Sequence, residues 1–291
     1  MTLVTLTPTA ATSPPPLAVP EGDGLVELRT GQRHRRRWQM PRPLRRLSGP
    51  VAVVALWWLL SAIGVLSPRT LPPPGDVVWA AVDLTRTGEL QTALWASLQR
   101  VLVGLAIGLT AGLLIAVAAG LTRRGEDVID SSMQIMKAIP NFALVPLLII
   151  WMGIGEAPKI TLVALSTAMP IYVNTYGAIR GVDNRLIEVG RTLGLGRFGI
   201  VRHLVLPGSL PGFLIGLRIS LTNAWLALIF AETINAKSGL GQLMSDARSW
   251  FRLDIMVLVI VVYAILGLLS YSVVRFLEKH LLQWRRGFEG S

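Results

Sequence analysis

Long stretches without charged residues are the dominant pattern along this chain. Residues 47–66, 160–179 and 255–274 carry no charge, and neither do the 22 residues between Arg100 and Arg123. Two further runs, 131–155 and 203–231, contain a single charge each, Lys137 and Arg218. A helix needs about 20 apolar residues to cross a hydrocarbon core of about 30 Å. The pattern therefore predicts six transmembrane helices.

The expected spans are 47–66, 97–121, 131–152, 158–178, 209–233 and 254–275. The alternative is a soluble domain with six buried helices, but it would leave almost no polar helix faces for water. The predicted fold class is all-α, in a polytopic membrane protein.

Composition agrees with this interpretation and adds a conflict. The chain is 52% hydrophobic and 15% charged, with a mean hydropathy of +0.55, yet it has a net charge of +11. Soluble domains are about one quarter charged, so the low charge content favours a membrane protein, whereas the basic balance points to an anionic partner. The absence of cysteine excludes disulfides and Cys-ligated metals. Three histidines far apart argue against a histidine metal site, and we expect neither a metal nor a catalytic site.

The distribution of the positive charges resolves the conflict. Six spans divide the remaining chain between two sides, and 19 of the 28 Lys and Arg fall on the side of the N-terminus, against six on the other. The positive-inside rule then makes that side cytoplasmic. We expect a multi-pass protein of the bacterial inner membrane with both termini in the cytoplasm.

Residues 1–46 differ from the rest of the chain. They are rich in Thr, Ala and Pro at first and then basic, with RHRRR at 33–37. Nucleic-acid binding is one interpretation. We favour a disordered cytoplasmic arm whose charges meet anionic lipid headgroups, because the basic run immediately precedes the first span. No nucleic acid is expected as a partner.

Several residues within the predicted spans have specific consequences for packing and polarity. Gly104, Gly108 and Gly112 follow the G-x-x-x-G spacing, as do Gly208, Gly212 and Gly216, which allows helices to approach closely. Pro140, Pro146 and Pro170 are expected to kink the third and fourth spans. Polar side chains at membrane depth must find a partner or water. The candidates for lining a polar pathway are Asn141, Asn174, Asn223 and Arg218, although each alone is more often structural.

The segment 183–207 is the most informative one. Its apolar residues are Leu186, Val189, Leu193, Phe198, Val201, Leu204 and Val205. This spacing predicts two short amphipathic helices, broken at 194–196. Gly194, Gly196 and Gly199 match G-x-G-x-x-G, but a dinucleotide site requires a preceding strand, and a helix is expected there. No lysine follows a glycine, so a Walker A loop is absent from the sequence.

The same segment resembles the cytoplasmic motif of membrane subunits of ATP-binding cassette importers. That motif is Glu-Ala-Ala, three residues, Gly, nine residues and Ile-x-Leu-Pro; its matches here are Glu188, Gly190, Gly194, Leu204, Leu206 and Pro207. Both Ala positions and the Ile are substituted. The resemblance extends over about 90–285, leaves out the N-terminal arm, and is strongest to the subgroup that imports aliphatic sulfonates, taurine, nitrate or bicarbonate.

This resemblance implies a type I importer permease fold and a function in transport, with the sulfonate branch preferred. It implies that 183–207 holds a coupling helix that docks on a separate ATPase subunit, with Glu188 near the helix start, favourably placed for the helix dipole or for a cation on the partner. The implied assembly contains two copies of this chain, two ATP-binding subunits and an extracytoplasmic substrate-binding protein. The chain itself would be no enzyme and hold no cofactor, with ATP and Mg²⁺ on the partner. The outer loop 234–252, with Ser238–Gly241 and Trp250-Phe251, would face the binding protein or be a plain connection.

Two other classes of protein remain as alternatives. A stand-alone secondary carrier needs ionisable residues deep in its spans, often with inverted repeats, and neither is evident here. A membrane-embedded enzyme needs converging acidic or histidine side chains, whereas the three histidines lie in separate segments of the chain.

Overall fold

A computed structural model describes residues 42–122 and 125–284 of the chain. Its internal contacts divide the chain into two units at Gly49 and Pro50. The described part of the first unit, residues 42–49, is helical. All that follows concerns the second unit, unless α1 is named.

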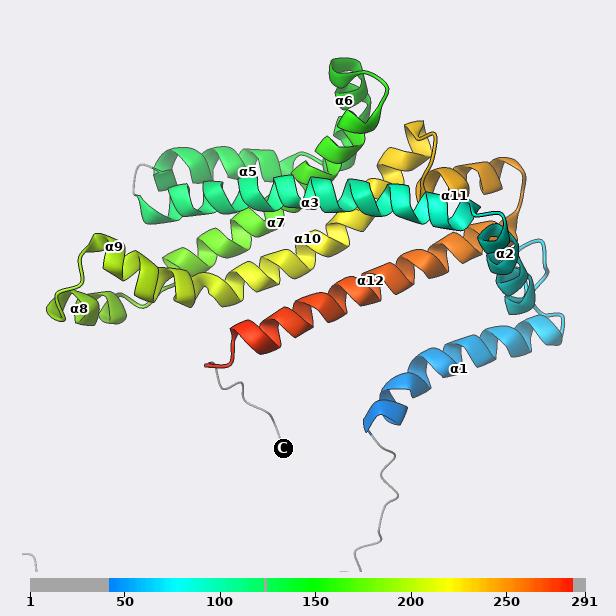
Figure 1. The fold of residues 1–291 in the computed structure, drawn as a ribbon, viewed down its shortest axis with the longest axis horizontal. Coiled ribbons are helices and arrows are strands. Elements are labelled where there is room, and N and C mark those ends of the chain that lie inside the picture. Colours follow the sequence, from blue (N-terminus) through cyan, green and yellow to red (C-terminus); the bar gives the residue numbers. More distant parts are fainter. Residues whose placement is uncertain (1–41, 123–124, 285–291) are drawn as a thin grey trace, which may run out of the picture. The chain divides into compact units, whose positions relative to one another are not determined.

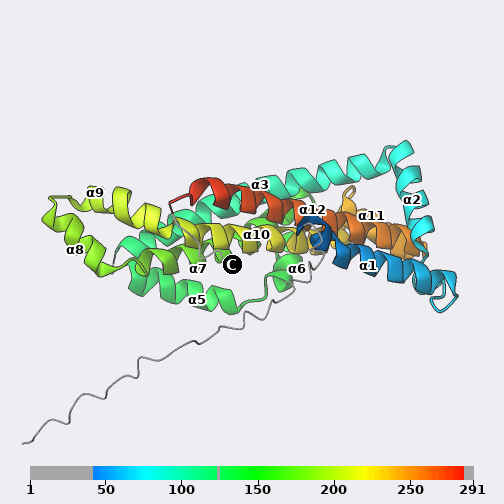
Figure 2. The ribbon, with the colours of Figure 1, turned by 90° about the horizontal axis from the view of Figure 1, so that it is seen from below.

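Within the described residues, every regular element is a helix. The elements are α1 (Arg42–Ala62), α2 (Pro74–Arg86), α3 (Glu89–Leu121), η1 (Glu126–Asp130), α5 (Ser131–Ala138), η2 (Asn141–Leu144), α6 (Val145–Met152), α7 (Glu156–Arg180), α8 (Asn184–Thr192), α9 (Arg197–Ile200), η3 (Val201–Val205), α10 (Leu206–Asn235), α11 (Leu240–Ser249) and α12 (Leu253–Leu281). Helices α8 and α9 lie at one end of the bundle, and α2 and α11 lie at the other (Figures 1 and 2).

Helix α7 is central because both α3 and α10 pack closely along it. The contact with α3 runs along buried Gly104, Gly108 and Gly112. A Cβ added at Gly104 would lie 2.7 Å from Cβ of Val163 on α7. Without side chains at these positions the two backbones approach each other closely, as the G-x-x-x-G spacing predicts.

The second glycine series forms the contact between α10 and α7, on a face of α7 that adjoins its contact with α3. A Cβ at Gly216 would lie 2.9 Å from the Pro170 carbonyl oxygen, and Gly212 lies against Ala178. Ser220 Oγ on α10 also donates to the Thr167 carbonyl oxygen of α7 at 2.7 Å. Small residues thus join α3, α7 and α10 into one tightly packed unit.

Four helical segments are long and apolar enough to cross a membrane: Glu89–Leu121, Glu156–Arg180, Arg197–Ile234 and Leu253–Leu281. The expected spans 97–121, 158–178, 209–233 and 254–275 lie inside them. The helices are longer than the predicted spans. The prediction used charge-free runs and therefore left out helix ends that carry charged residues such as Glu89 and Glu278.

The expected span 131–152 is divided into two parts. The helical segments Glu126–Ala138 and Asn141–Met152 meet at an angle of 83°. The break falls at Ile139 and Pro140, as expected for a residue that cannot continue a helix. Pro146 is instead in the first turn of α6, where proline is tolerated, and Pro170 lies within the uninterrupted α7. Helix breakage therefore occurs at one of the three prolines.

The first helix begins and ends earlier than expected. Helix α1 starts at Arg42, so 42–46 are helical rather than part of a disordered arm, and it ends at Ala62 instead of residue 66. Its apolar part, Ser48–Ala62, is shorter than 18 residues. The rest of the expected arm, 1–41, lies outside the described residues.

Candidate functional site

The segment 183–207 forms a helical hairpin with well-defined ends. Asp183 caps α8, its side chain accepting a hydrogen bond from the Arg185 backbone N–H at 2.9 Å. At the other end, Gly194 has φ +82°, and its N–H donates to the Arg191 carbonyl oxygen at 3.0 Å. The Leu195 N–H donates to the Gly190 carbonyl oxygen at 2.9 Å. These two bonds form a Schellman motif, so the sharp turn at Gly194 follows from its lack of a Cβ.

The structure brings together two of the expected site residues, Gly190 and Leu204. Gly190 is buried, and a Cβ there would lie 2.8 Å from Cδ1 of Leu204. Helix α8 therefore rests on the second arm of the hairpin at a position where only glycine fits without displacement.

Another face of α8 is apolar and exposed. Leu186, Val189 and Leu193 are 53%, 54% and 76% exposed, and Phe198 beyond the turn is 77% exposed. Their spacing of three and four residues places the first three on one helix face. The hairpin therefore presents an exposed apolar surface.

Glu188 lies in the middle of α8, not in its first turn. The expectation that its carboxylate interacts with the helix dipole is therefore wrong, because that effect is confined to the terminal turn. Asp183 occupies the capping position instead. The Glu188 side chain is exposed, as a residue that meets a cation on a partner has to be.

The second arm is not a separate short helix. The segment Arg197–Ile234 is helical for 38 residues, with a π-helical turn at Val201–Val205. Leu206 and Pro207 are the first residues of α10. Pro207 thus directly follows the π-helical turn and does not end the continuous helix.

The helix that precedes Gly194, Gly196 and Gly199 shows that this glycine pattern is not part of a dinucleotide-binding site. Helix α8 comes directly before it, where a dinucleotide site requires a strand.

The candidate pathway residues lie on three different elements. Asn141 begins η2, Asn174 is on α7 and Asn223 is on α10; all three are half-buried. The side-chain amide of Asn174 donates to the Pro170 carbonyl oxygen at 2.9 Å, beside Gly216. The structure thus places Asn174 at the contact of α7 with α10.

Arg218 forms contacts with α12. Its guanidinium donates to Glu278 at 2.5 Å and lies 5.3 Å from the ring centroid of Tyr271. The Arg218 guanidinium thus has an ion-pair partner and a cation–π contact within the chain.

A polar cluster with a buried centre lies at the end of the bundle opposite α8, and the pattern of uncharged runs did not predict it. We define the outer polar cluster as Ser97, Arg100, Glu156, Lys159 and Glu232. Arg100 donates to Glu232 at 2.5 Å and to both carboxylate oxygens of Glu156, and Lys159 lies 3.1 Å from Glu156. Arg100 and Glu232 are 5% and 1% exposed.

The outer polar cluster also holds the start of α11. Glu232 accepts hydrogen bonds from Ser97 Oγ and from the Gly241 N–H, each at 2.8 Å. The Ser238 carbonyl oxygen accepts from Arg100 at 2.6 Å. Four helices, α3, α7, α10 and α11, are therefore joined by charges. The sequence does contain one indication of this cluster. Arg100 and Glu232 are the charged residues at the ends of two long, nearly uncharged runs.

The expected outer loop has two distinct parts. Leu240 and Gly241 are buried against the outer polar cluster, so Ser238–Gly241 turns inward. Trp250 and Phe251 are 80% and 88% exposed at the end of α11. This second part is exposed and accessible to a partner.

Known proteins similar to this chain are membrane transport subunits. The family described as Binding-protein-dependent transport system inner membrane component matches residues 108–283. The putative aliphatic sulfonates transport permease protein SsuC of Escherichia coli (strain K12) is 44% identical over 239 residues, which cover 82% of this chain and 91% of that protein. Its namesake in Bacillus subtilis (strain 168) is 38% identical, covering 83% and 87%.

The fold is similar to that of a solved ABC transporter chain. The crystal structure of an amino acid ABC transporter with histidines matches with a TM-score of 0.58 at 15% identity, covering 69% of this chain and 97% of that one. This likeness concerns the helical architecture alone.

Proposed function

Because the chain belongs to the family of binding-protein-dependent transport system inner membrane components, the permeases of ATP-binding cassette importers, we propose that it carries aliphatic sulfonates into the cytoplasm. The observation that carries the substrate class is the 44% identity to a sulfonate permease over most of both chains. The family implies an ATPase and a substrate-binding protein as partners. The chain is a multi-pass protein of the inner membrane.

The proposed assembly has two copies of this permease, two ATP-binding subunits and one extracytoplasmic binding protein. ATP and Mg²⁺ bind on the ATPase subunits, and this chain is not itself an enzyme. The lack of any Gly-Lys pair, and hence of a Walker A loop, supports this division of labour.

The hairpin at 183–207 is the proposed coupling element. Short amphipathic helices bind partners by placing an apolar face in a groove, and the exposed Leu186, Val189 and Leu193 provide such a face. Gly190, Gly194, Leu204, Leu206 and Pro207 give the hairpin its shape, and the exposed Glu188 is free to pair with a cation of the ATPase. ATP-driven movement of the ATPase then biases the bundle between two states.

In the proposed topology, six spans place both termini in the cytoplasm, with α1 as the first span. The excess of Lys and Arg on one side supports this orientation. Asn141, Asn174 and Asn223 are the proposed pathway residues, and the ion pair of Arg218 with Glu278 supports a structural role for that arginine.

Reconstitution tests the substrate. The permease is co-expressed with a candidate ATPase and binding protein from the same organism and incorporated into liposomes. ATP-dependent uptake of ethanesulfonate is then compared with that of taurine, nitrate and bicarbonate. Preferential uptake of alkanesulfonates is the expected result. Preference for another of these anions would contradict the sulfonate assignment, and uptake without the ATPase would indicate a secondary carrier.

A further inference from the structure

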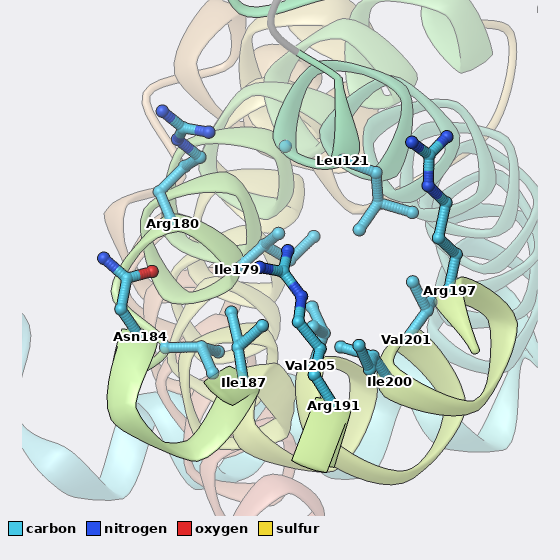
Figure 3. Close-up of a pocket in the computed structure, with 12 residues that line it drawn as sticks. Leu121, Ile179, Arg180, Asn184, Ile187, Arg191, Arg197, Ile200, Val201 and Val205 are labelled. Atoms are coloured by element: carbon cyan, nitrogen blue, oxygen red, sulfur yellow. The ribbon is translucent and has the colours of Figure 1, made fainter. Parts of the chain in front are cut away.

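A cavity of about 740 Å³ lies between the hairpin and the ends of α3 and α7. This size falls in the range of small-molecule sites. Figure 3 shows the Arg191 side chain extending from α8 into the opening, with Arg180 and Arg197 on either side. The cavity belongs to the end of the bundle that the charge distribution places in the cytoplasm.

The cavity has an apolar base. Ile179, Ile200 and Val205 are buried and pack together there, and further aliphatic side chains, among them Leu121 and Ile187, also line the cavity. Aliphatic carbon atoms of a ligand would therefore leave water on entering.

The rim is cationic and only partly neutralised. Arg180 pairs with Glu126 at 2.6 Å. In the part of the chain that the structure describes, Arg191 and Arg197 have no carboxylate within 4.0 Å, and the Asn184 amide belongs to the same rim. Two guanidinium groups without a counter-ion favour a phosphate or sulfonate, whose oxygens accept paired hydrogen bonds.

The cavity and the exposed apolar face of α8 point in different directions. Asn184, Ile187 and Arg191 follow one another at three and four residues and line the cavity. At about 100° per residue, this row lies on the side of the helix opposite to the exposed Val189 and Leu193. A ligand in the cavity leaves the proposed ATPase contact free.

We propose that this cavity binds an amphiphilic oxyanion, with its phosphate or sulfonate group at Arg191 and Arg197 and its aliphatic part against the apolar base. Two sources offer this chemistry: the headgroup of an anionic phospholipid in the inner leaflet, and an aliphatic sulfonate in the cytoplasm. Basic pockets at the cytoplasmic ends of membrane helices bind such headgroups. The site goes beyond the proposed function, since its lining includes none of the proposed pathway residues and includes residues of the hairpin.

Binding to the purified full-length permease tests the proposal in two arms. In the first, nanodiscs of phosphatidylcholine with and without phosphatidylglycerol are used, and retained phosphatidylglycerol is measured by native mass spectrometry. In the second, 1-octanesulfonate is titrated in pure phosphatidylcholine nanodiscs, and the shift in melting temperature is followed. The variant is Arg191→Gln with Arg197→Gln. The matched control is Arg185→Gln, an exposed arginine of α8 that does not line the cavity.

The double variant is expected to weaken binding about tenfold in at least one arm, because two charge-assisted hydrogen bonds are lost, while Arg185→Gln binds as the wild type does. Weaker binding of phosphatidylglycerol by the double variant indicates a lipid headgroup as the ligand, and weaker binding of 1-octanesulfonate indicates an aliphatic sulfonate. Arg191→Lys with Arg197→Lys keeps the charge, and intermediate binding is expected for it. Equal binding by the double variant and the control, or no binding by the wild type in both arms, would overturn the proposal. Neither arm measures transport, so this failure is separate from failure of the proposed function.

Discussion

At the scale of single residues, the outer polar cluster is the feature with the largest energetic consequence. Glu232 is almost fully buried and accepts hydrogen bonds from Ser97, Arg100 and Gly241. A charge buried to this degree is tolerated only with its partners in place. The cluster therefore stabilises one arrangement of α3, α7, α10 and α11.

Removing one charge from this cluster is expected to destabilise the fold. Arg100→Met leaves Glu232 without its cation and should cost about 3–5 kcal/mol. Arg252→Met is the control, because the Arg252 side chain is 51% exposed in its pair with Asp254 and exposed pairs contribute about 0–1 kcal/mol. Thermal unfolding of the purified variants in one detergent measures both. Equal melting temperatures for the two variants would contradict the buried pairing.

The pair of Arg218 with Glu278 leads to a second expectation at this scale. If its role is structural, Arg218→Glu should reduce sulfonate uptake, and adding Glu278→Arg should restore at least half of it, because the exchanged pair has the same attraction. If Arg218 instead serves the anion pathway as a cation on α10, the double variant Arg218→Glu with Glu278→Arg should not recover uptake. Uptake in reconstituted liposomes, normalised to inserted permease, distinguishes the two roles.

At the scale of elements, glycine determines how closely helices approach and where the hairpin turns. Gly108 faces Thr167 and Ala164 across the contact of α3 with α7. A Cβ added at Gly194 would instead meet no atom within 4 Å, so glycine is favoured there by the positive φ alone. The two positions thus respond differently to substitution.

The contact of α3 with α7 predicts that Gly108→Ala is destabilising. The added methyl group would press on Thr167 and the Ala164 carbonyl oxygen, and overpacking of this kind costs about 1–3 kcal/mol. Gly267→Ala on α12 is the matched control, because an added Cβ meets nothing within 4 Å there. This control should be neutral or stabilising, since alanine is the better helix former. A melting temperature for Gly108→Ala at or above that of the control would contradict the close approach.

The hairpin predicts loss of coupling for Gly194→Pro and Glu188→Lys. Proline cannot adopt φ +82° and removes the N–H that bonds to Arg191. Glu188→Lys reverses the exposed charge offered to the ATPase. Both variants should insert normally but lose most ATP-dependent uptake. Gly196→Ala is the control, because Gly196 has φ −67° and open space around it. Unchanged uptake with Gly194→Pro would exclude the coupling role.

At the scale of the whole molecule, the distribution of charge predicts orientation. The absence of cysteine allows single cysteines to report on it directly. Thr192→Cys on α8 and Ser249→Cys at the end of α11 are both exposed positions. In spheroplasts, a membrane-impermeant maleimide should label Ser249→Cys and spare Thr192→Cys until the membrane is permeabilised. Labelling in the reverse order would invert the topology.

Much of the architecture was predictable from the chain, because charge-free runs and glycine spacing are local patterns. The hairpin at 183–207 and its break near Gly194 could be anticipated for the same reason. The outer polar cluster was not, because Ser97, Arg100, Glu156 and Glu232 are far apart in sequence and meet only through packing. The early start of α1 was also missed, since arginines in a first helical turn look the same in sequence as a charged arm.

The continuous helix Arg197–Ile234 connects the hairpin at one end of the bundle to Glu232 at the other. At 1.5 Å per residue, 38 residues make a rod about 57 Å long. A tilt of about 10° about one end of such a rod displaces the other end by about 10 Å. In the proposed assembly, Glu232 in its buried cluster is the pivot of this helix, and movement of an ATPase docked at the hairpin would displace the hairpin end much further than the Glu232 end.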